Sequence, residues 1–188
     1  MARYSIEDTT LNNIADAIRS KTGKTDGIVV GDMASEISGI VSGKDTTMED
    51  GFIDGSLAAS LENYTNSTVT NIKNSAFVGF SKLTDVSFPA VTTIGASAFR
   101  SCTSLTTINF PAVTNIGSNA FYDCASLTSP IFPKCITIGS YAFGVCSNLT
   151  SIDFPMCTTI NSQAFYSCKN LATIDCSNCT TIGYAAMY

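Results

Sequence analysis

Hydrophobic side chains recur with a period of 22 residues over most of this chain. In the clearest unit the apolar positions run from a leucine to a cysteine, and they are Leu83, Val86, Phe88, Val91, Ile94, Ala98, Phe99 and Cys102. The next units carry the same residue types at nearly every equivalent position. A unit this short cannot bury eight apolar positions by itself, so we expect the units to stack as coils of a solenoid.

The period also sets the boundaries of the array. Residues 61–82 keep the register but have polar residues where later units have Phe-Pro, as expected of a terminal capping unit. The units that follow are 83–104, 105–126, 127–148, 149–170 and a partial unit, 171–188. We therefore predict that the solenoid occupies residues 56–188.

Each unit predicts a short parallel strand followed by a tighter segment. The stretch from Leu83 to Phe88 has β-branched and aromatic residues, and Pro89 ends it because proline cannot donate to a ladder. Residues 91–95 predict a second short extended segment, and residues 97–99 predict a turn of α-helix or 3₁₀-helix. The predicted fold class is thus an α+β repeat, a short solenoid with 22-residue coils built from a parallel strand plus a turn or 3₁₀ segment.

The amino-terminal part lacks the repeat. Residues 1–42 predict a small two-helix module, because apolar residues there follow helical spacing: Leu11, Ile14, Ala15 and Ile18 in the first helix, and Met33, Ile37 and Ile40 in the second. Residues 43–55 predict a linker that begins with a polar stretch. The module is expected to act as an attachment or as a cap.

Composition and charge remove several classes of function. The chain has no histidine, which excludes Ser-His-Asp and Cys-His catalysis and zinc sites that need imidazole. The net charge of −5 comes from residues 1–60, with ten acidic and five basic residues, whereas residues 61–188 hold five of each. Without clustered Lys and Arg we expect no nucleic acid partner, and without a long apolar stretch we expect no membrane insertion.

The eight cysteines are expected to be free thiols without a metal. Seven of them lie in two columns that follow the 22-residue period: Cys102, Cys124, Cys146 and Cys168, and Cys135, Cys157 and Cys179. Stacked equivalents lie about 4.8 Å apart with parallel Cβ vectors, a poor geometry for a disulfide. Cys176 and Cys179 have CxxC spacing, but one such pair is only half a zinc site. Asp153 and Asp175 share one repeat position, so their carboxylates are expected to stack. Such a pair could bind a cation or act as an acid pair, and these remain alternative interpretations.

The repeated unit resembles the BspA-like class of bacterial leucine-rich repeats over about residues 61–188, because Leu-x-x-Ile-x-Phe-Pro and Ile-Gly-x-x-Ala-Phe-x-x-Cys recur in order. The resemblance implies a right-handed leucine-rich-repeat solenoid and a recognition module of the adhesin or surface-protein kind. Pro130, Cys176-Ser177 and Met187 depart from the motif, which makes the third and last coils less regular. Residues 11–23 and 31–37 resemble a helical module of phage and prophage tail or minor structural proteins, which implies attachment to a larger particle.

We predict a non-enzymatic recognition or adhesion protein with no cofactor, which binds a protein or a cell-surface glycan through the repeat surface. The alternative is a purely structural spacer subunit of a tail or surface assembly. The candidate binding face consists of residues that point outward from the predicted strands: Asp85, Ser87, Asn109, Ile131, Asp153 and Asp175. The start of the chain predicts no signal peptide, and display on a bacterial surface or a phage virion is expected. Residues 1–42 are the candidate contact with other assembly subunits.

Overall fold

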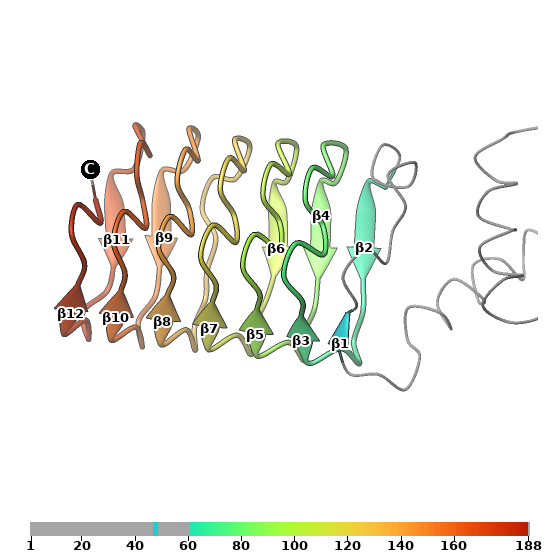
Figure 1. Ribbon diagram of the computed structural model, residues 1–188, viewed down its shortest axis with the longest axis horizontal. Helices are drawn as coiled ribbons and strands as arrows, with labels where there is room; N and C mark the ends of the chain where they lie inside the picture. Colours follow the sequence, from blue (N-terminus) through green and yellow to red (C-terminus); the bar gives the residue numbers. More distant parts are fainter. Residues whose placement is uncertain (1–46, 49–60, 188) are drawn as a thin grey trace, which may run out of the picture. The chain divides into compact units, whose positions relative to one another are not determined.

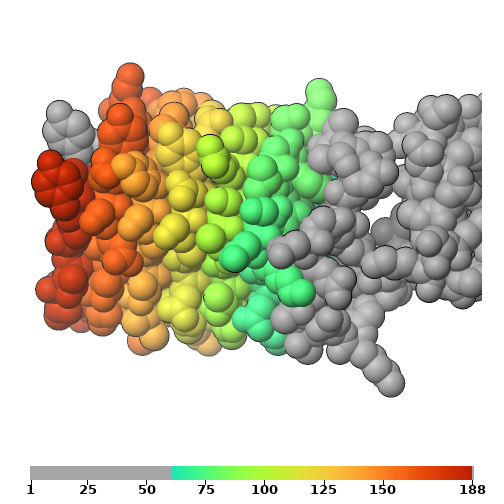
Figure 2. Space-filling view, in the orientation of Figure 1, coloured from blue at the N-terminus to red at the C-terminus, as the bar shows by residue number. Residues whose placement is uncertain are grey.

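The computed structural model describes residues 47–48 and 61–187. Residues 61–187 form a parallel-strand solenoid in which 22-residue coils stack one on another, so the predicted repeat architecture is confirmed (Figure 1). Figure 2 shows the coils as successive bands in direct contact. The predicted two-helix module, residues 1–42, lies outside the described residues.

Each coil contributes a strand of two residues to one continuous parallel sheet. Ile94 pairs with Ile116, and equivalent residues pair along the whole sheet, which confirms the predicted second extended segment. We call this the short-strand sheet, and it contains β1 (Thr47–Met48), β3 (Asn71–Ile72), β5 (Thr93–Ile94), β7 (Asn115–Ile116), β8 (Thr137–Ile138), β10 (Thr159–Ile160) and β12 (Thr181–Ile182).

Strand β1 departs from the expected organisation of the chain. Thr47 pairs with Asn71, so strand pairing begins inside the segment 43–55 that we predicted to be a linker. The other residues of that segment lie outside the described part of the chain, and the remaining linker boundary stays a prediction.

The longer strands, three residues each, lie before the Phe-Pro step or the residues equivalent to it, and form two separate sheets. These are β2 (Asn63–Thr65), β4 (Asp85–Ser87) and β6 (Thr107–Asn109), and then β9 (Ser151–Asp153) and β11 (Thr173–Asp175). Between them, residues 129–131 contribute only an isolated bridge from Ile131 to Asp153. Pro130 lies within this segment and has no N–H for a ladder, which explains the interruption and confirms the predicted irregularity of the third coil.

The core contains two columns of stacked phenylalanine rings, which aliphatic residues, alanines and cysteines surround. One column contains Phe77, Phe99, Phe121, Phe143 and Phe165, with ring centroids of successive members 5.0, 5.3, 5.2 and 5.7 Å apart. The other contains Phe88, Phe110, Phe132 and Phe154, with separations of 5.6, 6.2 and 5.4 Å. All nine rings are buried, because each coil covers the rings of its neighbours.

The tight segment of each coil differs from the predicted turn of helix. In the unit 83–104, Ser97 and Ser101 have positive φ angles of 56° and 58°, which interrupt any run of helical residues. The backbone N–H of Arg100 bonds within the turn, to the carbonyl of Ser97 at 3.1 Å. The N–H of Phe99 instead reaches the next coil, at the carbonyl of Ala120, 2.7 Å away. The segment is therefore a pair of turns that also hydrogen-bonds from coil to coil.

Candidate binding surface

The candidate residues project from one surface of the solenoid, which we call the long-strand face. It is the outward surface of β2, β4, β6, residues 129–131, β9 and β11. The outward positions of these strands alternate with core residues, as Val86 shows: it is buried between Asp85 and Ser87, which are both partly exposed. The outward column consists of Ser87, Asn109, Ile131, Asp153 and Asp175, and its last four members are all exposed. The structure thus brings the predicted residues onto one face, while their role in binding stays a prediction.

The polar members of the column are not equivalent. Asn109 donates from Nδ2 to Oγ of Ser87 at 2.9 Å, so two members satisfy each other. The carboxylate of Asp85 accepts a hydrogen bond from Oγ1 of Thr84 at 2.8 Å. Asp153 has no such partner among the described residues and lies in register with Asp175 on the adjacent strand. The carboxylate of Asp175 accepts a hydrogen bond from the N–H of Ser177 at 3.3 Å, so Asp153 is the column's carboxylate without such a partner in the described part of the chain.

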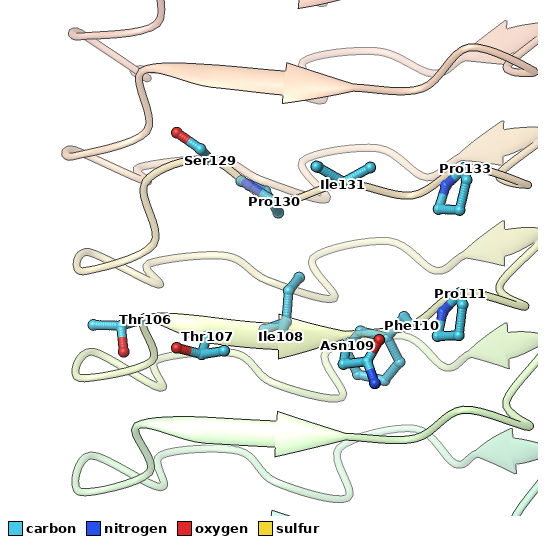
Figure 3. Close-up of a pocket in the computed structure, with 10 residues that line it drawn as sticks. All are labelled: Thr106, Thr107, Ile108, Asn109, Phe110, Pro111, Ser129, Pro130, Ile131 and Pro133. Atoms are coloured by element: carbon cyan, nitrogen blue, oxygen red, sulfur yellow. The ribbon is translucent and has the colours of Figure 1, made fainter.

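The apolar member of the column is the most conspicuous. Ile131 is 59% exposed, although isoleucine and valine elsewhere in the longer strands point into the core. It lies beside an opening of about 410 Å³ between β6 and residues 129–131 (Figure 3). Ile108, Phe110, Pro111, Pro130 and Pro133 contribute to the walls of this opening. The sequence marked Pro130 as irregular, but it gave no direct signal that a cavity would form beside it.

A second candidate surface lies on the turns. The Cζ atom of Arg100 lies 5.5 Å from the ring centroid of Tyr122, and Tyr141 bridges Tyr122 and Tyr166 with ring separations of 6.5 and 5.9 Å. The hydroxyl of Tyr141 also hydrogen-bonds to Oε1 of Gln163. We call Arg100, Tyr122, Tyr141 and Tyr166 the tyrosine stripe. Its rings pack edge to face against each other, so part of their aromatic surface is used inside the protein.

All eight cysteines are free thiols in the structure, and seven of them lie in the two predicted columns. The thiol of Cys102 donates to the carbonyl of Phe77 at 3.0 Å, and Cys124 repeats this contact with Phe99 at 3.2 Å. Burial raises the pKa of Cys102 to about 12, because the thiolate loses its hydration in the core. Burial likewise raises the pKa of Cys124, so Cys102 and Cys124 are packing residues and poor nucleophiles.

Comparison with known proteins agrees with this architecture. A leucine-rich cell surface protein from Faecalibacterium prausnitzii is 29% identical, with a TM-score of 0.60, over 63% of this chain and 33% of that protein. A leucine-rich repeat protein from Bacteroides ovatus is 30% identical, with a TM-score of 0.57, over 61% of this chain and 33% of the other. One from Eubacterium ventriosum is also 30% identical, with a TM-score of 0.57, over 64% and 34% of the two chains. The matched region thus spans about a third of each of these proteins.

A search of curated proteins gave no significant match. Among the described residues, no helix has both the length and the apolar character that a membrane span requires. The model of the BspA-type leucine-rich repeat region matches residues 62–188 with six copies. This match covers well over half of the chain and places the repeats where the structure has its coils. The chain belongs to the BspA-type leucine-rich repeat proteins.

Proposed function

We propose that the chain is a non-enzymatic recognition protein that binds another protein through the long-strand face. The observation that carries the proposal is Ile131, an aliphatic side chain that is 59% exposed in the middle of an otherwise polar column. An exposed apolar residue among polar neighbours is typical of the centre of a protein interface. The extended surface of a solenoid also allows one partner to contact several coils.

The site of action that fits this role is outside the cell. The similar protein from Faecalibacterium prausnitzii is a cell surface protein, and by analogy we propose display of this chain on a bacterial surface. Attachment to a phage tail or virion through residues 1–42 rests only on the resemblance in the sequence. A purely structural spacer remains the competing function, and it requires no ligand on the long-strand face.

Binding to a captured partner tests the proposal. The full chain is immobilised, its interaction partner is isolated, and affinity is measured for the native protein and for the double variant Ile131→Ala with Asp153→Ala. We expect the double variant to bind at least about tenfold more weakly, because it loses the apolar centre and a free carboxylate of the face. Its thermal stability should stay close to that of the native chain, since both side chains are exposed.

A matched variant on the tyrosine stripe provides the control. Tyr166→Ser changes an exposed aromatic residue on the turns and should leave affinity unchanged. Loss of binding in Tyr166→Ser together with full binding in the double variant would move the site to the turns. Absence of any partner for the native chain would favour the spacer.

A further inference from the structure

The interruption at Pro130 leaves backbone groups without their usual partners. The N–H groups of Phe88 and Phe132 each reach the next coil, at the carbonyls of Asn109 and Asp153, both at 3.0 Å. In the described part of the chain, the N–H of Phe110 makes no such bond to Ile131. Polar backbone groups normally find a partner, so the N–H of Phe110, directly after β6, is available to water or to a ligand.

The interruption also uncovers a core position. Val86 and Ile152 are 2% and 1% exposed, but Ile108, which occupies the same position in β6, is only partly buried. The residue that should cover Ile108 from the next coil is Pro130, which is smaller than the isoleucine of the motif. Figure 3 shows the side chain of Ile108 directed from β6 toward residues 129–131. The opening therefore reaches a side chain of the hydrophobic core.

The packing of the rings below agrees with a local separation of two coils. Phe110 and Phe132 have ring centroids 6.2 Å apart, whereas the neighbouring pairs of this column are 5.6 and 5.4 Å apart. On the other column, which lies away from Pro130, Phe121 and Phe143 of the same two coils remain 5.2 Å apart. The second and third coils thus separate at the long-strand face while their turns stay packed.

The charged residues at the outward positions of the long strands are all acidic. The outward positions of the long strands carry Asp85, Asp153 and Asp175 and no Lys or Arg. Asp85 accepts a hydrogen bond from Thr84, and Asp175 accepts one from the backbone N–H of Ser177 at 3.3 Å. Asp153 and Asp175 are both exposed and lie on adjacent strands in direct register. Like charges in this arrangement repel each other, and a cationic group of a ligand would relieve the repulsion.

We propose that the opening between β6 and residues 129–131 is the anchor pocket for an extended segment of a partner protein. A bulky aliphatic side chain of the segment enters the pocket between Ile108 and Ile131. The pocket has a volume of about 410 Å³, which exceeds that of one side chain. A Lys or Arg of the same segment pairs with Asp153 and Asp175. This inference rests on the proposed function and specifies the partner chemistry at the same face.

The spacing of the strands sets the spacing of the ligand groups. Neighbouring strands lie about 4.8 Å apart, so Asp175 is two strand spacings, or about 10 Å, from Ile131. An extended peptide rises about 3.3 Å per residue. The basic residue should therefore lie about three positions from the aliphatic one when the segment runs across the coils.

The test uses synthetic peptides and the full chain. All the peptides have a central leucine and one variable residue, which is lysine, glutamine or glutamate. The distance of the variable residue from the leucine differs from peptide to peptide. Fluorescence anisotropy measures the dissociation constant of each peptide. We expect lysine peptides to bind about five- to tenfold more tightly than glutamate peptides, and only near the predicted spacing, since each exposed charge pair contributes little. Raising the salt concentration should reduce this preference.

Two variants separate the pocket from the charges. Pro130→Ile restores the residue type found at Ile108 and Ile152, and should close the opening, reduce peptide affinity by at least about tenfold and raise the melting temperature. Asp153→Asn with Asp175→Asn should abolish the preference for lysine but keep the requirement for leucine. Asp123→Asn is the matched control, and it should leave binding unchanged because the carboxylate of Asp123 lies on the turns, where it accepts a hydrogen bond from Oγ of Ser101 at 3.2 Å. If Pro130→Ile does not fold, Ile131→Ser tests the pocket with an exposed residue.

The outcomes distinguish this inference from the proposed function. Failure of every peptide to bind, or binding that Pro130→Ile and Asp153→Asn leave intact, overturns the anchor pocket. The long-strand face still stands in that case if the captured partner is lost from the Ile131 and Asp153 double variant. If every variant of the face still binds both the peptides and the captured partner, the anchor pocket and the proposed function are both overturned. A dimer in sedimentation that Ile131→Ser dissociates would assign the face to a second copy of the chain and overturn the peptide site.

Discussion

The phenylalanine columns predict that the cost of a core substitution depends on its place in the array. Phe121 is fully buried and contacts four rings: Phe99 and Phe143 stack on it at 5.3 and 5.2 Å, and Phe110 and Phe132 lie at 6.1 and 5.8 Å. Phe165 is equally buried but contacts only Phe143 and Phe154, at 5.7 and 6.2 Å. The two residues thus share burial and differ in the number of aromatic neighbours.

The expected magnitudes follow from this difference. Truncation of a buried phenylalanine to alanine costs about 3–5 kcal/mol of unfolding free energy, and an aromatic pair contributes about 0.5–1.5 kcal/mol beyond its buried area. With two more ring contacts, Phe121→Ala should fall at the upper end of the range. Phe165→Ala should fall at the lower end, about 1–2 kcal/mol less destabilising.

Urea unfolding followed by circular dichroism measures both variants against the native chain. Phe121→Leu and Phe165→Leu are the milder pair if an alanine variant is too unstable to purify. The slope of the unfolding free energy against urea concentration should be the same in all variants, since the surface exposed on unfolding hardly changes. Equal losses at the two positions, or a larger loss at Phe165, would refute the reasoning that stability is summed over contacts between neighbouring coils.

Three further predictions concern backbone strain and the thiols. Val145 is a β-branched residue with a φ of 61°, so Val145→Asn should stabilise the chain by about 0.5–1 kcal/mol in thermal unfolding, while Asp123→Asn at the equivalent position should be neutral; a loss of stability in Val145→Asn would contradict this. Burial raises the pKa of Cys102 and Cys135 to about 12 and that of Cys157 to about 11, from an ordinary 9.0. The thiols of the unfolded chain therefore ionise first. The stabilisation by the buried neutral thiols is fully present below pH 9 and should fall by up to about 1.4 kcal/mol per pH unit for Cys102 and for Cys135 as the pH rises toward 12, and by less for Cys157. Melting in reductant should show a shallower decline for Cys102→Ala, and an unchanged slope would argue against the raised pKa. Alkylation after denaturation without reductant should add eight adducts by mass, and fewer adducts on fresh protein would reveal bridged or coordinated cysteines.

Much of the fold was predictable because the same apolar residues recur at the same positions of every 22-residue unit. Leu83, Val86 and Ile94 were expected in the core, and all three are buried. Each ladder position occurs in several coils, so an isolated substitution does not hide the pattern. The outward column was predictable for the same reason, since it lies between two core positions of a strand.

The turns were harder to predict because their conformation does not depend on a fixed residue type. Positive φ angles occur at Ser97, Asn119, Tyr141 and Gln163, which occupy one position in successive units. A glycine at this position would have indicated a left-handed backbone conformation, but tyrosine and glutamine do not. Here the coil-to-coil hydrogen bonds of the neighbouring N–H groups hold the conformation, and they appear only when the coils are stacked.

The opening beside Ile108 illustrates why a departure from a repeat acts on its neighbour. Pro130 is itself buried, and the motif around it is otherwise kept. The effect falls on β6, in the preceding coil, where Ile108 loses its cover and the N–H of Phe110 lacks the usual bond to the next coil. In a solenoid each side chain is packed by residues one period away, so a substitution must be judged against the equivalent positions in the adjacent coils. The same rule makes Asp153 and Asp175 one acidic group, although 22 residues separate them in the sequence.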